Sequence, residues 1–163
     1  FTTTATIRVV PFIAQKVMDI NAISINVRTT AASTEVRLGI YNDNGLGYPE
    51  TLIVDAGTVT TTTAGQRSIC ASGCTTTGNA NLPKRIQPGL YWLALNNNSI
   101  AFTAWGFNVA NMNPVTGFPN TTTVRQVGWT VANSYAALPT LFPSAAAAMT
   151  AVPAPVIGVR IQE

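Results

Sequence analysis

The chain has 163 residues, of which 47% are hydrophobic and only 9% are charged, and nine Lys and Arg against six Asp and Glu give it a formal net charge of +3. This length fits a single domain over residues 1–163, and so few charges argue against a helical bundle or coiled coil. The nine cations are scattered along the chain, which argues against nucleic-acid binding.

The first half of the sequence predicts strands separated by short turns. Ala5–Val10 is expected to be a strand that ends at Pro11. In residues 23–28 and 35–41, apolar side chains alternate with polar ones, which is the period of a strand with one buried face. Asn and Gly adopt positive φ at low cost, so residues 42–45 (NDNG) predict a turn after the third strand.

Residues 52–95 continue the pattern of predicted strands separated by turns and loops. Leu52–Val54 and Gly57–Thr62 predict one strand with a bulge near Gly57, and residues 64–81 predict a long exposed loop. Leu90–Leu95 is nearly all apolar, which is typical of a central strand buried on both faces.

The second half is more irregular. Ile100–Trp105 is expected to be the neighbour of the central strand, and further strands are expected at Val124–Val131 and Val156–Ile161. Residues 106–123 and 132–155 are expected to be loops, the latter with one helical turn at Ala145–Ala148. The whole pattern predicts an all-β, jelly-roll-like antiparallel β-sandwich of about eight strands with long loops in the second half.

The ends and the cysteines bear on where such a domain works. The chain begins at Phe1 without an initiator Met, which indicates a processed product or part of a longer chain. The longest apolar stretch, residues 89–95, is far shorter than the roughly 20 residues of a membrane helix, so no membrane insertion is expected. Cys70 and Cys74 are close enough in sequence for a small local disulfide, and the alternative is two free thiols in a surface loop.

Features typical of catalysis are missing from the sequence. There is no His, the commonest general base and metal ligand, and the spacing of the six acids does not indicate a catalytic pair. No nucleophile elbow, phosphate-binding loop or dinucleotide motif occurs. We therefore expect a protein that is not an enzyme, with no catalytic residues, no metal and no cofactor.

A few residues are still candidates for contacts. Four aromatic residues fall in or beside the second-half loops, where they could stack on glycans, fill a subunit interface or pin the loops onto the sandwich: Trp105, Phe107, Trp129 and Tyr135. Arg37 and Asp55 are expected to form a partly buried structural ion pair between neighbouring strands.

Four segments carry a resemblance to a known family: residues 23–27 (ISINV), 36–43 (VRLGIYND), 49–57 (PETLIVDAG) and 90–94 (LYWLA). Their order resembles a β-sandwich domain of tailed-bacteriophage virion surface proteins, of the tail-fibre or head-decoration type, and residues 157–161 (IGVRI) resemble how such domains end. The likeness covers roughly residues 7–105 and the last six residues. It implies a structural module on the virion surface, commonly a homotrimer, and it carries no active site.

Three functions remain open from the sequence. The first is a tail-fibre or receptor-binding module that contacts other virion proteins and a host-surface glycan. The second is a capsid decoration or cement protein. The third is a carbohydrate-binding module of a secreted protein, which Trp105 and Trp129 exposed on one concave face would favour and the burial of both would oppose.

Overall fold

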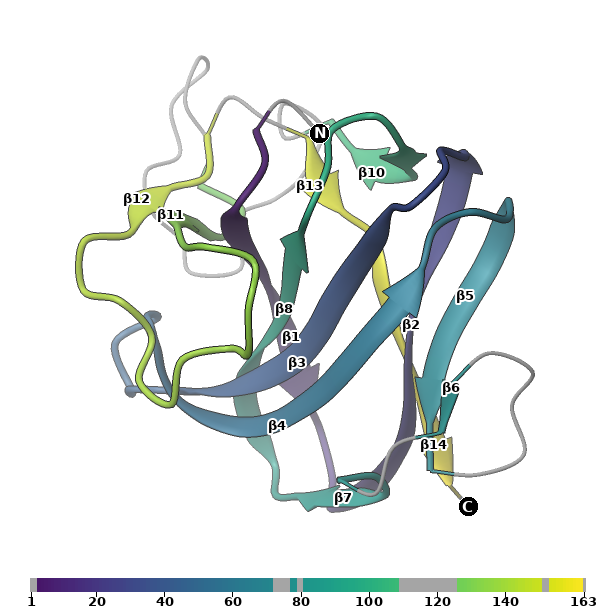
Figure 1. The fold of residues 1–163 in the computed structure, drawn as a ribbon. Coiled ribbons are helices and arrows are strands. Elements are labelled where there is room, and N and C mark those ends of the chain that lie inside the picture. Colours follow the sequence, from purple (N-terminus) through teal and green to yellow (C-terminus); the bar gives the residue numbers. More distant parts are fainter. Residues whose placement is uncertain (1–2, 72–76, 79–80, 109–125, 151–152, 163) are drawn as a thin grey trace.

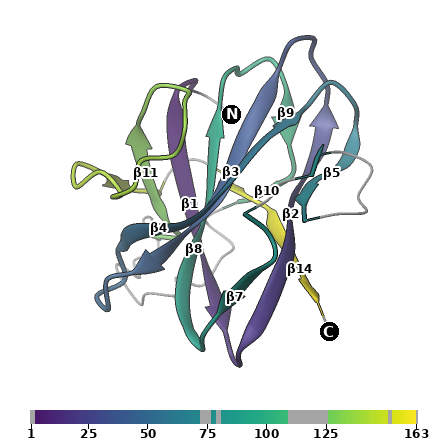
Figure 2. The same cartoon turned by 60° about the horizontal axis from the view of Figure 1, so that its bottom comes forward.

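The computed structural model describes residues 3–71, 77–78, 81–108, 126–150 and 153–162, and these residues form strands and loops with no helix (Figure 1). Most strands belong to two sheets that pack face to face (Figure 2). Among the described strands every pairing is antiparallel except that of β5 with β6. The predicted all-β sandwich is confirmed.

The first sheet has six strands in the order β12-β11-β1-β8-β3-β4. Its strands are β1 (Thr6–Ala14), β3 (Glu35–Asp43), β4 (Pro49–Thr60), β8 (Gly89–Asn97), β11 (Trp129–Ala132) and β12 (Ala147–Ala148).

The second sheet has the order β14-β2-β5-β6, and two short strands also pair with β2. Its strands are β2 (Met18–Thr29), β5 (Gly65–Cys70), β6 (Thr77–Gly78) and β14 (Ile157–Gln162), with β7 (Lys84–Ile86) and β9 (Thr103–Ala104) beside β2. A separate pair, β10 (Gly106–Phe107) and β13 (Ala154–Pro155), lies at the end of the sandwich where the N-terminus is (Figure 1).

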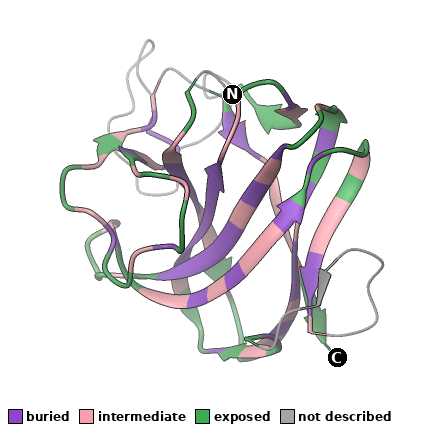
Figure 3. Ribbon diagram, viewed as in Figure 1, coloured by how far each residue is buried: buried purple, intermediate pink, exposed green. Residues whose placement is uncertain are grey.

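The main core lies between the two sheets and includes the alternate residues within 23–28 and 35–41 that the sequence predicted to be buried. Ile23, Ile25 and Val27 of β2 face Val36, Leu38 and Ile40 of β3, and none of the six is more than 2% exposed. Removing this apolar surface from water supplies the main driving force for folding. Figure 3 shows the buried residues concentrated in the long strands of the two layers.

The central strand of the first sheet is β8, as its apolar sequence predicted. It pairs with β1 on one side and with β3 on the other, and Trp92, Leu93, Ala94 and Leu95 are each at most 3% exposed. Such burial is possible only because both faces of this sheet are covered.

β1 is longer than the sequence predicted, and β4 contains the predicted bulge. β1 does not end at Pro11 but continues to Ala14, with Pro11 opposite Trp92. Among the described residues, β11 pairs with β1 only as far as Val9, so Pro11 lies where no described strand pairs with β1 on that side, as is usual for a proline in a sheet. The bulge expected in β4 is confirmed, because the register with β3 shifts at Gly57, whose φ is 86°.

Other expectations in the later part of the chain were wrong. The supposed loop at 64–81 contains β5, which pairs along β2 and buries Ile69. Ile100–Trp105 does not neighbour the central strand, because only β9 forms there and it joins β2 in the second sheet. Ala145–Ala148 is not a helical turn, since Ala147 and Ala148 pair as a strand with β11. Of the strand expected at Val124–Val131, residues 124–125 lie outside the described part.

Candidate functional site

The outer face of the first sheet is covered by a segment of irregular chain, residues 133–146, which we call the covering segment. Leu138 and Phe142 from this segment are 4% and 6% exposed, and they pack on the outward side chains of the central strands. The result is a second apolar core, whose buried members are Ile7, Val9, Tyr41, Trp92, Ala94, Val131, Leu138 and Phe142. This face is therefore not open to a ligand.

Hydrogen bonds hold the covering segment in place. The hydroxyl of Tyr41 donates to the backbone carbonyl of Pro139 (2.9 Å), and that of Tyr48 donates to the carbonyl of Pro143 (2.6 Å). The amide of Phe142 donates to the carbonyl of Glu50 (2.8 Å). The Phe142 ring meets both tyrosine rings edge to face, at centroid distances of 5.3 and 5.8 Å, which is a favourable aromatic geometry.

The Arg37–Asp55 pair expected from the sequence is present beneath this segment. Arg37 Nε lies 2.8 Å from Asp55 Oδ1 and 2.9 Å from Oδ2, and the two side chains are 23% and 17% exposed. Asp55 also accepts hydrogen bonds from the amides of Gly57 and Leu138. The pair thus joins β3, β4 and the covering segment.

The VRLGIYND segment that carries the family resemblance is explained by this arrangement. Its alternate residues Arg37, Gly39 and Tyr41 face the covering segment, while Leu38 and Ile40 face the main core. A Cβ on Gly39 would collide with the Leu138 side chain and with the carbonyl oxygen of Val54. These outward residues therefore hold the cover and make room for it.

Trp129 and Tyr135, two of the four aromatic candidates, also belong to this covered side. Trp129 is half-buried, its Nε1 donates to the carbonyl of Gly47 (2.9 Å), and its ring packs against Tyr48 with a centroid distance of 4.7 Å. The Tyr135 hydroxyl is buried, and burial, together with the negative charge of Glu35, raises the pKa of Tyr135 above its ordinary value. Trp129 therefore has the contacts expected of a loop-pinning side chain.

The outer face of the second sheet differs. Ser24, Asn26 and Arg28 of β2 point away from the core, and register places Ser68 and Gly158 opposite Ser24, and Gln66 opposite Asn26. All of these residues are half-buried or exposed. We call this surface the open face, and it also includes the exposed Arg160 on β14, whose Nε donates to Asn21 Oδ1 (2.8 Å).

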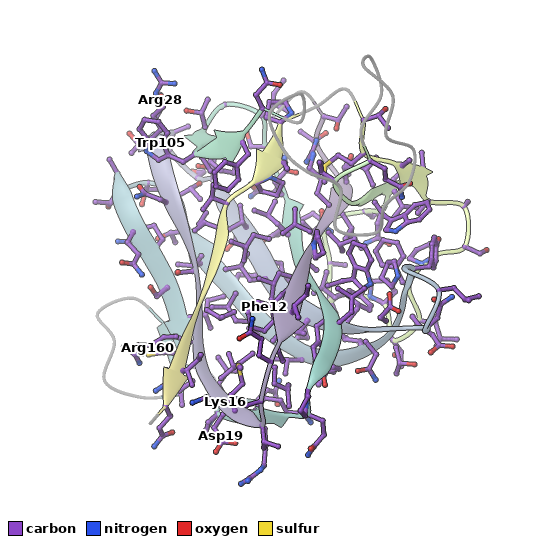
Figure 4. All side chains as sticks on the ribbon, turned by 180° about the vertical axis from the view of Figure 1, so that it is seen from behind. Phe12, Lys16, Asp19, Arg28, Trp105 and Arg160 are labelled. Carbon is purple, nitrogen blue, oxygen red and sulfur yellow. The ribbon has the colours of Figure 1, made fainter. Side chains whose placement is uncertain are left out.

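Trp105 stands at one end of the open face and Arg160 near the other (Figure 4). The Trp105 amide donates to the carbonyl of Asn26 (2.9 Å), and the guanidinium carbon of Arg28 lies 5.2 Å from the centroid of the Trp105 ring. Trp105 remains 52% exposed. It is not grouped with Trp129, which packs on the other sheet, so the two tryptophans do not form one concave face.

A third surface lies on the side of the sandwich between β1 and β14, and we call it the apolar side. Two grooves of about 500 and 190 Å³ meet there at Phe12. Ile13, Phe107 and Ile161 line them and are 55%, 52% and 42% exposed. Val17, which is 40% exposed, lies in the turn between two residues that line the larger groove, Lys16 and Met18.

Sequence reasoning identified only Phe107 on this side. The available signal was the pair Phe12-Ile13, two adjacent large apolar residues on opposite faces of one strand. One of the two had to face outward unless something covered it. Which segment lies beside β1 depends on long-range pairing, however, and the sequence pattern does not show this.

The other side chains that could take part in catalysis or metal binding, the acids and the cysteines, do not form a site in the described residues. Asp43 accepts hydrogen bonds from Trp92 Nε1 (2.8 Å) and from the Gly45 amide (2.7 Å). Within the described residues no three His, Cys, Asp or Glu side chains gather as a metal site would need, and no helix there could span a membrane. Cys70 is fully buried and disulfide-bonded, while Cys74 lies outside the described residues.

Comparisons with protein-family models, with curated proteins and with solved structures find no match to this chain.

Proposed function

We propose that this chain is a structural domain on the surface of a tailed-bacteriophage virion, of the tail-fibre or receptor-binding type, which assembles with copies of itself through the apolar side. The family resemblance motivates the virion setting, and the apolar side is the observation that supports assembly. Four of the eight large hydrophobic residues exposed in the described part lie there. Exposed apolar patches of this kind mark interaction surfaces.

The composition of the chain agrees with this role. Only 9% of its residues are charged, so few charges oppose the close approach of identical copies. The expected assembly is a closed homotrimer, in which the apolar sides of three copies converge on the three-fold axis and each copy contacts its two neighbours through different parts of that side. Two of the carboxylates, those of Asp43 and Asp55, accept hydrogen bonds with structural roles, which supports a non-catalytic function.

Light scattering on the purified chain tests the assembly. We expect a mass of about three times 17.2 kDa. The double variant Ile13→Asp/Val17→Asp, which places two charges on the apolar side, should be monomeric. The matched control Leu46→Asp/Leu141→Asp changes residues that are 88% and 65% exposed away from both grooves, and it should keep the wild-type mass. A monomeric wild type, or equal behaviour of the two variants, would reject assembly through this side.

The virion setting needs a separate test. Mass spectrometry of purified particles from the phage that encodes the chain should detect its peptides in stoichiometric amount. Their absence from the particles would contradict the virion proposal even if the chain forms a trimer. A monomer in solution that binds only to assembled capsids would instead favour the decoration or cement function.

Carbohydrate binding is the second candidate, and one observation favours it. Trp105 is an exposed aromatic side chain beside a cation and a row of polar side chains, which is the kind of surface that can stack on and hydrogen-bond to sugars.

A further inference from the structure

Charge is distributed unequally between the two layers of the sandwich. Among the described residues, the first sheet carries two cations and four acids: Arg8, Arg37, Glu35, Asp43, Glu50 and Asp55. The second sheet and the turn before it carry six cations and one acid: Lys16, Arg28, Arg67, Lys84, Arg85, Arg160 and Asp19. The layer with the open face is therefore the positive one, and it favours an anionic partner.

The open face also has a defined internal order. Arg28 and Trp105 lie at one end, and Arg160 stands at the other, opposite Ala22 on the neighbouring strand. Ala22 and its partner Cys70 on β5 point to the same side but are 3% and 0% exposed, so the open part of the face ends at their level. Positions 22 and 28 of β2 are about 20 Å apart at the rise of a strand. Between them lie neutral side chains that can donate and accept hydrogen bonds: Ser24, Asn26 and Gln66.

This spacing distinguishes among polyanions. Nucleic acids carry a charge every few ångströms and are bound by clustered cations, whereas here two exposed arginines are separated by a neutral hydrogen-bonding row. A lipid surface would be met by a group of exposed apolar side chains beside the cations. Here Trp105 lies beside Arg28, but the side chains described between Arg28 and Arg160 are polar. A chain of hydroxylated rings with widely spaced acidic groups fits the row better.

We propose that the open face binds an anionic polysaccharide, with Arg28 and Arg160 contacting carboxylate or sulfate groups and Trp105 packing against a sugar ring. The planar guanidinium suits bidentate contact with such groups. The amides and hydroxyls between the arginines bind the neutral part of the polymer. This inference rests on the attachment role in the proposed function, and it does not depend on assembly through the apolar side.

Titration calorimetry with defined polymers tests it. Hyaluronan oligosaccharides of increasing length, which carry one carboxylate per disaccharide, should bind more tightly until they span the face, and affinity should fall as salt is raised. Dextran, a neutral polymer, should bind at least tenfold more weakly. Duplex DNA should also bind more weakly than hyaluronan, because its charges do not match the row.

Variants then assign the site. Arg28→Gln/Arg160→Gln should lower the affinity for hyaluronan about tenfold or more, as loss of a charged hydrogen bond implies, and Trp105→Ala should lower it about tenfold. Arg67→Gln is the matched control, because Arg67 lies opposite the inward-facing Ile25 and bonds to Thr60. It should leave the affinity within about twofold, which is less than a single ordinary hydrogen bond is worth.

Several outcomes would overturn the inference: no binding of hyaluronan, equal binding of dextran or DNA, or equal losses in the control and the open-face variants. Thermal melting of the open-face variants should stay close to that of the wild type, since Arg28, Trp105 and Arg160 are exposed. Repeating the titration with the Ile13→Asp/Val17→Asp variant separates the two proposals. If the wild-type protein is a trimer but does not bind hyaluronan, only the polysaccharide inference is rejected. If the wild-type protein binds hyaluronan but is a monomer, only the assembly through the apolar side is rejected.

Discussion

The two outer faces of this sandwich show how similar strand patterns can end in opposite surfaces. On β2, the residues that alternate with the buried ones are Ser24, Asn26 and Arg28, and they form an open polar face. On β3, the equivalent outward residues are Arg37, Gly39 and Tyr41, and they lie under the covering segment. The residue types at the outward positions therefore indicate whether the sheet is covered or open to solvent. Those at the inward positions indicate only that the strand faces a core.

The largest expected effect comes from loosening the cover. Phe142→Ala should lower the free energy of unfolding by about 3–4 kcal/mol, because it removes a buried ring that packs on Tyr41 and Tyr48. Urea denaturation measures this change. The neighbouring Leu141 is 65% exposed, so Leu141→Ala should cost less than about 0.5 kcal/mol. Similar losses in both variants would mean that the cover does not stabilise the sheet.

The two ion pairs give a second comparison between the layers. Arg37→Ala should lower the free energy of unfolding by about 2 kcal/mol, because it leaves the partly buried Asp55 without its cation. Arg85 and Asp19 lie 4.0 Å apart with side chains that are 70% and 42% exposed, so Arg85→Ala should cost at most about 0.5 kcal/mol. Thermal melting of the two variants distinguishes them, and an unchanged melting temperature for Arg37→Ala would reject the structural role of that pair.

Alkaline pH should affect the covered side selectively. Burial, and secondarily the charge of Asp55, raise the pKa of Tyr41 above its ordinary value of 10.0. The folded protein keeps the hydroxyl proton of Tyr41 at pH values where the unfolded chain has lost it. The contribution of Tyr41 to the free energy of unfolding is therefore constant below about pH 10. Above that it decreases with rising pH, by up to about 1.4 kcal/mol per pH unit.

Urea denaturation between about pH 8 and pH 11, across the ordinary pKa of tyrosine, measures this slope. Tyr41→Phe should reduce the slope by the equivalent of about one proton. It should also cost about 1 kcal/mol at neutral pH through the lost hydrogen bond to Pro139. A slope identical to that of the wild type would show that Tyr41 ionises normally in the folded protein.

The smallest effect is expected on the open face. Arg28→Gln removes an exposed contact with the Trp105 ring, and it should change the free energy of unfolding by no more than about 0.5–1 kcal/mol. Differential scanning calorimetry is sensitive enough to measure this. A larger loss would mean that Arg28 supports the fold, so that a binding defect in its variants could not be assigned to the ligand.

The sequence predicted one side of this comparison better than the other. Periodicity identified the inward residues of β2 and β3 because burial between two sheets repeats every second residue. The covering segment has no such period. The hydroxyls of Tyr41 and Tyr48 bond to main-chain carbonyls of this segment, those of Pro139 and Pro143, and a main-chain acceptor leaves no trace in the side chains of the segment itself.

The sequence did not predict the open face or the apolar side, for a related reason. Arg28 and Trp105 meet because β9 pairs with the end of β2, and Phe12 meets Ile161 because β14 pairs with β2 beside it. Both contacts depend on pairings between distant parts of the chain. The Arg37–Asp55 pair was easier to anticipate, since β3 and β4 follow each other in the sequence and few charges were available to pair.

The position of the two chain ends has a mechanical consequence. The N-terminus and the C-terminus lie at opposite ends of the sandwich (Figure 1), and β1, the first strand, pairs with β8 from Ile7 to Ala14. A force that pulls the ends apart acts along this ladder, so its hydrogen bonds share the load instead of opening one after another. This arrangement of strands is suited to withstand tension applied between the two ends of the sandwich.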